Sequence, residues 1–259
     1  MNYGKIHYRG AGACLCQVPA RRKNFSHPRS CKLTTQDNEL TEVEGMAADI
    51  DAHLLALPNR KTENVRAIRR EFSKRLANAH AGVVIGLALE LFERPNFEYR
   101  FVAYELVCHH HAALRSLGER ELEQLGHGID SWEDVDTFAC YLAGPAWREH
   151  QVPDTLIERW AHSEDRWWRR AALVSTVALN NKARGGSGDT ARTLQVCREL
   201  AGDRDEMVVK AMSWALRELS KRDPQAVHEF LAEQQGTLAA RVVREVRNKL
   251  STGLKNPRR

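Results

Sequence analysis

Residues 164–220 decide the fold, through the segments EDRWWRRAALVSTVALN (164–180), DTARTLQVCRELA (189–201) and RDEMVVKAMSWALRELS (204–220). Apolar residues in each segment recur at intervals of three and four, which is the spacing of an α-helix with one apolar face. The glycine-rich stretch 185–188 interrupts the pattern after the first segment. The stretch therefore predicts three amphipathic helices joined by short connections.

The same periodicity extends outward in both directions, and strand-like alternation is almost absent. Further helices are expected over 45–57, 62–78, 80–93, 97–113, 119–128, 131–142, 153–161, 223–233 and 237–251. Breakers such as Pro58, Pro95 and Gly144-Pro145 separate them. The pairs recur at roughly 40 residues, the spacing of HEAT-type repeats, in which one pair alone cannot bury its apolar stripe.

We therefore expect an all-α fold, a HEAT-like helical-repeat solenoid of about six antiparallel helix pairs. Stacks of this kind curve, and their inner helices line a long groove that suits a rod-like ligand such as a duplex. A compact all-α bundle is the competing arrangement. The expected organisation is a disordered basic leader over 1–43, the repeat domain over 44–252 and a basic tail over 253–259.

Composition excludes several classes of protein. The chain has 259 residues, of which 42% are hydrophobic and 28% charged, and no apolar run approaches the roughly 18 residues of a membrane-spanning helix. No secretory signal pattern follows the basic start, so we expect a cytoplasmic protein. Cys108, Cys140 and Cys197 lie in apolar helical segments and are expected to be free thiols.

Metal sites are not expected either. Cys14, Cys16, His27 and Cys31 could form a Cys3His zinc site, but their C-x-C spacing departs from the usual C-x2-C pairing. The histidines 109–111 end a predicted helix, where positive charge is favoured by the helix dipole. The glycine-rich stretch 185–188 lacks the lysine of a phosphate-binding loop and is interpreted as a connector between repeats.

Positive charge is concentrated in three segments. The net charge is only +5, yet 60–75, 166–184 and 239–259 are each rich in Lys and Arg and poor in Asp and Glu. Such asymmetry favours one or more basic faces that bind nucleic acid, here a concave basic face. The alternative is an ordinary solvated surface of charged helix faces.

One cluster departs from ordinary core composition: SWEDVD (131–136), RWWRRAAL (166–173) and KAMSW (210–214). Trp132 and Asp136 are four residues apart, so they share one helical face. Ser131 is a plausible N-cap for this helix. Asp136 falls in the helix interior, where a carboxylate needs a partner or solvent, and Arg170 is the obvious candidate partner.

The segments SWEDVD (131–136), RWWRRAAL (166–173) and KAMSWALRELSKRDP (210–224) resemble the AlkD-type DNA alkylation repair glycosylases, which are built from HEAT-like repeats. The resemblance extends over roughly 50 to 250. It implies that Asp136 is the catalytic aspartate, that Trp132 and Trp214 line the site, and that Arg170 contacts the DNA backbone. One departure is visible, since 47–51 supply no aromatic ring where the family has one.

The resemblance implies a monofunctional glycosylase that removes N3- and N7-alkylated purines from duplex DNA. Such bases are cationic and need no general acid, while a fixed carboxylate would stabilise the oxocarbenium-like sugar and position water. Further backbone contacts are expected from other basic residues, namely Arg166, Arg169, Lys182, Lys210, Arg241, Arg244 and Arg247. No cofactor is implied. Because no lysine is evident in a Schiff-base setting, we expect no lyase activity.

Two other functions remain open. A non-catalytic HEAT-type protein could bind damaged or branched DNA, and a helical scaffold could bind other proteins. For the glycosylase we expect alkylated duplex DNA as the partner, no membrane association, a monomer, and association with the nucleoid when DNA is bound.

Overall fold

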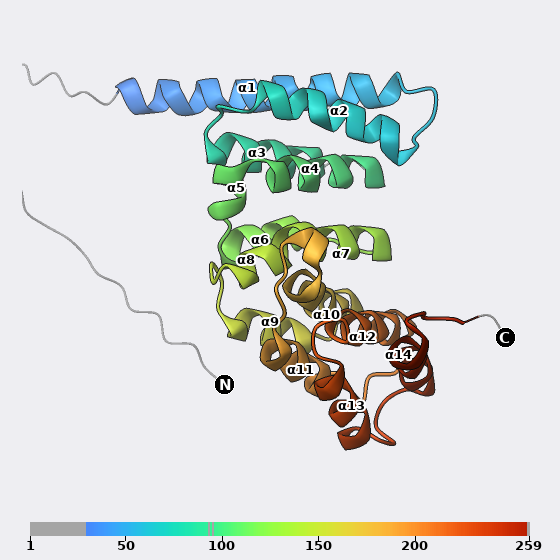
Figure 1. Ribbon diagram of the computed structural model, residues 1–259. Coiled ribbons are helices and arrows are strands. Elements are labelled where there is room, and N and C mark those ends of the chain that lie inside the picture. The colour runs from blue at the N-terminus through green and yellow to red at the C-terminus, as the bar shows by residue number, and fades with distance from the viewer. Residues whose placement is uncertain (1–29, 93, 95, 258–259) are drawn as a thin grey trace, which may run out of the picture.

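The computed structural model describes residues 30–257 apart from Glu93 and Pro95, and its helices stack in successive pairs (Figure 1). The α-helices are α1 (Ser30–Leu55), α2 (Thr62–Arg75), α3 (Ala81–Phe92), α4 (Phe97–His109), α5 (His111–Arg115), α6 (Glu119–Gly126), α7 (Trp132–Phe138), α8 (Gly144–Arg148), α9 (Asp154–Ala161), α10 (Arg166–Asn180), α11 (Thr190–Glu199), α12 (Glu206–Leu219), α13 (Pro224–Glu233) and α14 (Ala240–Thr252). A π-helix, η1 (Ala139–Ala143), joins α7 to α8, and a 3-10 turn, η2 (Lys182–Arg184), follows α10. The described ranges contain no strand.

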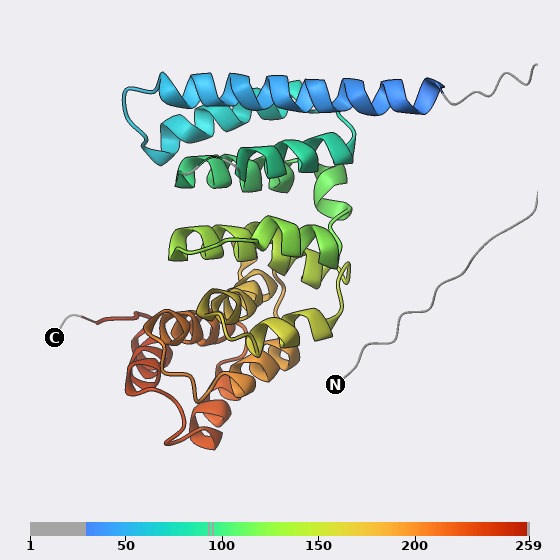
Figure 2. The ribbon, with the colours of Figure 1, turned by 180° about the vertical axis from the view of Figure 1, so that it is seen from behind.

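The second helices of the pairs form one continuous layer. Helix α2 packs on α4, α4 on α7, α7 on α10, α10 on α12, and α12 on α14; we call these six helices the second-helix layer. The first helices lie on the other side, where α1 contacts α3, α3 contacts α6, and α9 contacts α11. Figure 2 shows the same stack from behind. The predicted all-α helical-repeat solenoid is confirmed.

Aspartates at the helix starts explain why the observed helix bounds in the C-terminal half agree closely with the predicted ones. The carboxylate of Asp165 accepts the Trp167 N–H at 2.8 Å, which begins α10. Asp189, Asp205 and Asp223 cap α11, α12 and α13 in the same way. An N-cap of this type contributes about 1 kcal/mol, and it fixes the first turn of each helix.

The predicted break at Gly144-Pro145 is wrong. The chain remains helical from α7 through η1 into α8, and Pro145 lies within the first turn of α8. A proline ring inside a regular α-helix clashes with the carbonyl four residues earlier. The wider π-helical turn immediately before Pro145 relieves that clash. The opposite error occurs at His110, whose extended backbone separates α4 from α5 within the expected single helix.

The first helix also begins earlier than expected. Helix α1 starts at Ser30, so the boundary of the predicted disordered leader at 43 is wrong for 30–43. These residues contain neither Pro nor Gly, and nothing in their covalent structure stops the helix from continuing upstream. The rest of the predicted leader, including Cys14, Cys16 and His27, lies outside the described residues, as does the side chain of Cys31.

Close contact between α8 and α10 depends on a missing side chain. A β-carbon built on Gly144 would lie 2.5 Å from the Ala178 Cβ and 2.6 Å from the Ser175 carbonyl oxygen. Because such overpacking costs about 1–3 kcal/mol, Gly144→Ala should lower the free energy of unfolding by that amount in urea titrations. Gly82→Ala is the matched helical control, with nothing within 4 Å of its β-carbon; equal stability of the two variants would contradict this account.

Candidate active site

Asp136 and Arg170 form a bidentate ion pair between α7 and α10. The Arg170 Nε donates to Asp136 Oδ1 at 2.9 Å and its Nη2 donates to Oδ2 at 2.8 Å. The remaining terminal nitrogen, Nη1, donates to the Met207 carbonyl oxygen at 2.5 Å. Arg170 is only 5% exposed, so the planar guanidinium is held in one orientation. The pairing expected from the sequence is confirmed.

The start of α7 sets the direction in which Asp136 faces. The hydroxyl of Ser131 accepts the Asp134 N–H at 3.1 Å and caps the helix, as the sequence predicts. Trp132 and Asp136 then lie one turn apart on the same face. The Trp132 side chain is exposed, with 49% of the residue accessible, which is unusual for an indole with no partner to cover it.

Burial and neighbouring charge act in opposite directions on Asp136. Burial raises the pKa of the Asp136 carboxyl, whereas the hydrogen bonds and charge of Arg170 and the charge of Arg184 lower it. About a fifth of the side chain stays open, at 18% exposure. The result is a carboxylate fixed by a buried arginine and still open to a ligand on one side.

Trp214 lies on α12, two turns beyond Met207, whose carbonyl accepts from Arg170. Its side chain is half-buried and packs partly on the apolar core. Helices α10 and α12 pack directly on one another. The structure thus joins the helices that carry Trp132, Arg170 and Trp214 in the second-helix layer.

Besides Arg170, four of the basic residues expected at DNA are already paired. Arg169 donates from Nε to Asp203 at 2.7 Å and from Nη1 to two backbone carbonyls. Arg166 lies 3.5 Å from Asp205. Lys210 pairs with a carboxylate one turn earlier in α12, and Arg241 with one in α14. Arg169 in particular has a structural role, since it ties α10 to the loop before α12.

Three other predicted cations are more open to solvent. The side chain of Arg244 is 64% exposed, and its distance to the nearest carboxylate is 4.0 Å, the longest of the described ion pairs. Lys182 and Arg247 are exposed, and among the described residues no carboxylate lies within ion-pair distance of either. These are the predicted residues best placed to meet an external anion. Their contact with DNA stays a prediction.

The sequence matches the family model of the DNA alkylation repair enzyme over residues 56–250. The chain belongs to this family. A solved structure described as a "predicted DNA alkylation repair enzyme" from Enterococcus faecalis is similar, with a TM-score of 0.61 and 18% sequence identity over 81% of this chain and 95% of that chain. At that identity the likeness shows a shared fold alone. No curated protein matches the sequence.

In this member of the DNA alkylation repair family, sequence reasoning missed a buried carboxylate in α4. Glu105 is 2% exposed and accepts from Arg66 Nε at 2.8 Å and from Arg69 Nε at 3.1 Å, both on α2. Its position within the apolar segment FVAYELV (101–107) is the only available signal. The two arginines lie one repeat upstream, and no local spacing in the sequence indicates that contact.

A second missed residue lies one turn beyond Trp214. Arg217 is half-buried and its Nε donates to the Ser213 hydroxyl at 3.2 Å. Burial lowers the pKa of this guanidinium, opposed by the charges of Glu245 and Glu218. Because arginine stays charged even so, it is a cation one turn beyond Trp214 that lies near the charges of Glu218 and Glu245.

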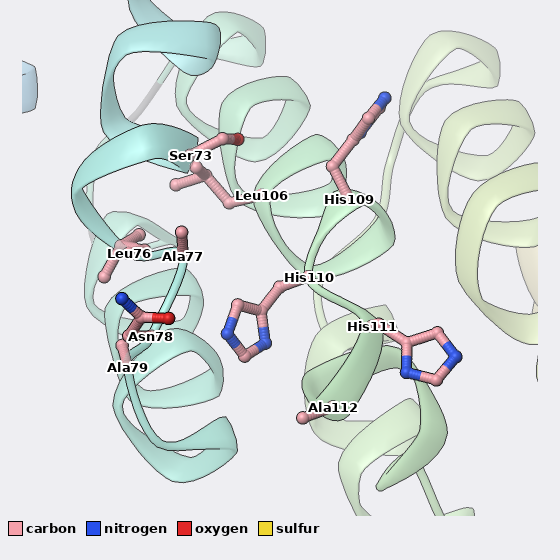
Figure 3. Close-up of a pocket in the computed structure, with 10 residues that line it drawn as sticks. All are labelled: Ser73, Leu76, Ala77, Asn78, Ala79, Leu106, His109, His110, His111 and Ala112. Atoms are coloured by element: carbon pink, nitrogen blue, oxygen red, sulfur yellow. The ribbon is translucent and has the colours of Figure 1, made fainter.

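An open pocket of about 450 Å³ lies where α2 ends beside the junction of α4 and α5. In Figure 3, His110 points toward this pocket and His109 points away from it. The ring of His109 bonds to the Glu105 carbonyl oxygen, and the His110 ring accepts the Ala113 N–H. Both rings therefore form hydrogen bonds with nearby backbone groups. Nowhere in the described chain do three metal-ligating side chains gather as a metal site would require.

Two further expectations concern the described residues as a whole. Cys108, Cys140 and Cys197 are free thiols, as predicted. Within 30–257, Glu93 and Pro95 aside, no helix combines the length and the apolar character that a bilayer crossing demands.

Proposed function

We propose that this protein is a monofunctional DNA glycosylase that hydrolyses the N-glycosidic bond of cationic N3- or N7-alkylated purines in duplex DNA. The observation that carries the proposal is the Asp136–Arg170 ion pair, fixed by two hydrogen bonds beside the exposed indole of Trp132. Membership of the DNA alkylation repair family supports a DNA repair role.

The chemistry needs little more than a fixed negative charge. In an alkylated purine the bond from C1′ to the base nitrogen breaks with its electron pair going to the base, which neutralises the positive charge there. Positive charge develops on the deoxyribose, and Asp136 stabilises it electrostatically. A water oxygen then bonds to C1′ and releases a proton, leaving a free base and an abasic site.

The tryptophans would favour charged lesions over normal nucleotides. Indole faces attract cations by about 0.5–2 kcal/mol each, and Trp132 is open to such a ligand on the face that carries Asp136. Trp214, on the neighbouring part of the second-helix layer, would line the other side of the site. Arg170 would hold Asp136 in place and would also lie near the DNA backbone.

The proposed partner is alkylated duplex DNA, bound mainly through phosphates by the more open cations such as Lys182, Arg244 and Arg247. Binding of this kind weakens as salt rises. The reaction uses no cofactor, and we propose a monomeric enzyme of the cytoplasm that associates with the nucleoid when bound to DNA. Without a Schiff-base lysine, the abasic strand should remain intact until alkali cleaves it.

A non-catalytic DNA-binding protein is the second candidate. The observation in its favour is that both oxygens of Asp136 already accept hydrogen bonds from Arg170. A carboxylate so occupied can serve as a structural ion pair alone. This candidate predicts tight binding of damaged or branched DNA with no abasic product.

The dependence of base release on pH tests the proposed chemistry. Only ionised Asp136 stabilises the cationic sugar, so activity disappears as pH falls through its pKa. Because burial raises that pKa above the ordinary value of 3.8, against the opposing effect of Arg170, the acid limb of the single-turnover rate should lie above pH 3.8. Circular dichroism at each pH controls for unfolding. A rate that stays constant down to the ordinary aspartate range would contradict the assignment.

A further inference from the structure

Arg184 has the features of an arginine prepared for an anion. Its guanidinium lies over the ring of Tyr141, 4.7 Å from the ring centroid. The side chain is half-buried, yet no hydrogen bond or ion pair within the described residues uses any of its N–H donors. Since a guanidinium has five donors in a planar fork, this one is left with all of them open.

The backbone around Arg184 is fixed. Arg148 donates from Nη1 to the Arg184 carbonyl oxygen at 2.6 Å. Gly185 ends the 3-10 turn η2 with a φ of 82°, in the left-handed region that glycine adopts without strain. The ring of Tyr141 and this turn together hold the guanidinium in one place before any ligand binds.

A second arginine lies at the other end of the same tyrosine. Arg66 Nη2 donates to the Tyr141 hydroxyl at 3.3 Å, and its Nε donates to Glu105. Glu105 is shared with Arg69, so two guanidinium groups share one carboxylate, and Arg184 at the Tyr141 ring has no carboxylate partner among the described residues. The excess positive charge is not neutralised by any other described carboxylate within ion-pair distance of Arg66 or Arg184.

This cluster lies near Asp136. Tyr141 belongs to η1, which continues directly from the helix of Asp136. Arg66 comes from α2 and Arg184 from the turn after α10, so the cluster joins repeats that are far apart in sequence. The charge of Arg184 is felt at Asp136, where it opposes the rise in pKa that burial causes.

We propose that Arg184 and Arg66, held at the face and the hydroxyl end of Tyr141, form a binding site for a DNA phosphodiester beside Asp136. The fork of an arginine matches the oxygens of a phosphate and binds it in a fixed orientation. Lys182 lies on the same turn, η2, as Arg184, whereas the open cations Arg244 and Arg247 lie on α14, so this site would hold the strand beside η2. The inference rests on the proposed function for its ligand, DNA.

The test is the salt dependence of binding to an unmodified, fluorescein-labelled duplex by full-length protein. The slope of log K against log [NaCl] is negative, and each lost phosphate contact lowers its magnitude by about 0.9. Arg184→Gln and Arg66→Gln should each weaken binding and lower the magnitude of the slope by about this amount. Arg159→Gln is the matched control, since Arg159 is an exposed arginine of α9 paired only with surface glutamates, and thermal melts verify folding of all three.

The outcomes separate this inference from the proposed function. Slopes of both Arg184→Gln and Arg66→Gln that equal those of wild type and of Arg159→Gln would overturn the phosphate site, even if the wild type releases alkylated bases. A reduced slope supports the site even if the wild type releases no base, because unmodified DNA reports phosphate contacts alone. A wild type that fails to bind duplex DNA overturns the site as well.

Discussion

Replacing Asp136 with asparagine is expected to lower the single-turnover rate of base release by about 10²- to 10³-fold, the usual loss when one preorganised electrostatic group is removed. Asparagine keeps the shape of the side chain and one oxygen that accepts from Arg170, but it leaves the buried guanidinium without a counter-charge, so the rate is compared only after circular dichroism has shown that the variant is folded. DNA affinity should be unchanged or slightly higher, because the substitution removes a negative charge near the phosphates. Release of 7-methylguanine and binding of an unmodified duplex measure the two quantities.

The same helix offers a matched control for that substitution. Glu133→Gln also neutralises a carboxylate of α7, and the charge of Glu133 acts on Asp136 itself. It forms no ion pair with Arg170, so its rate should stay within about threefold of wild type, as for surface changes that break no buried contact. Equal losses in both variants would mean that the rate follows the general charge of α7. The assignment of Asp136 as the reacting group would then fail.

Replacing Arg170 with methionine is expected to lower the free energy of unfolding by about 3–5 kcal/mol, because removal of one partner leaves a mostly buried carboxylate unpaired. Arg170 is 5% exposed and also binds the Met207 carbonyl, so the change breaks contacts between α7, α10 and α12. Urea denaturation followed by circular dichroism measures the loss. Base release should fall as well, since Asp136 would no longer be held in place.

Two comparisons test the physical reason for that loss. The double variant with Asp136→Asn should recover part of the stability, because no charge is then left unpaired. Arg159→Met removes an exposed ion-pairing arginine and should cost under about 1 kcal/mol. If Arg170→Met were no less stable than Arg159→Met, the ion pair would not be the element that joins α7 to α10.

The sequence was most informative where local chemistry decides the structure. Helices α10 to α13 begin at aspartate caps such as Asp165 and Asp205, and their predicted bounds agree with the structure to within a few residues. Prediction failed where tertiary packing overrides local signals. Gly144 and Pro145 are helix breakers by composition, yet the π-helix before them and the close approach of Ala178 make a continuous helix possible.

The candidate site shows the same division. Helical spacing placed Trp132 and Asp136 on one face, and the unexplained carboxylate led to Arg170 as its partner, which the structure confirms. The state of the other cations could not be predicted. Arg169 looks like a free basic residue in sequence, but Asp203, which neutralises it, comes from the next repeat. The position of Arg184 could not be predicted for the same reason, since Tyr141, whose ring it lies over, belongs to another helix.

Release of 7-methylguanine from a methylated duplex by the wild-type protein decides whether Asp136 belongs to a glycosylase site. We predict free base and an equal amount of alkali-labile abasic sites, with strands that stay intact before alkali. DNA binding without release of any base would contradict the assignment of Asp136 to such a site. The protein would then be a non-catalytic DNA-binding member of its family, and the Asp136–Arg170 pair a structural contact.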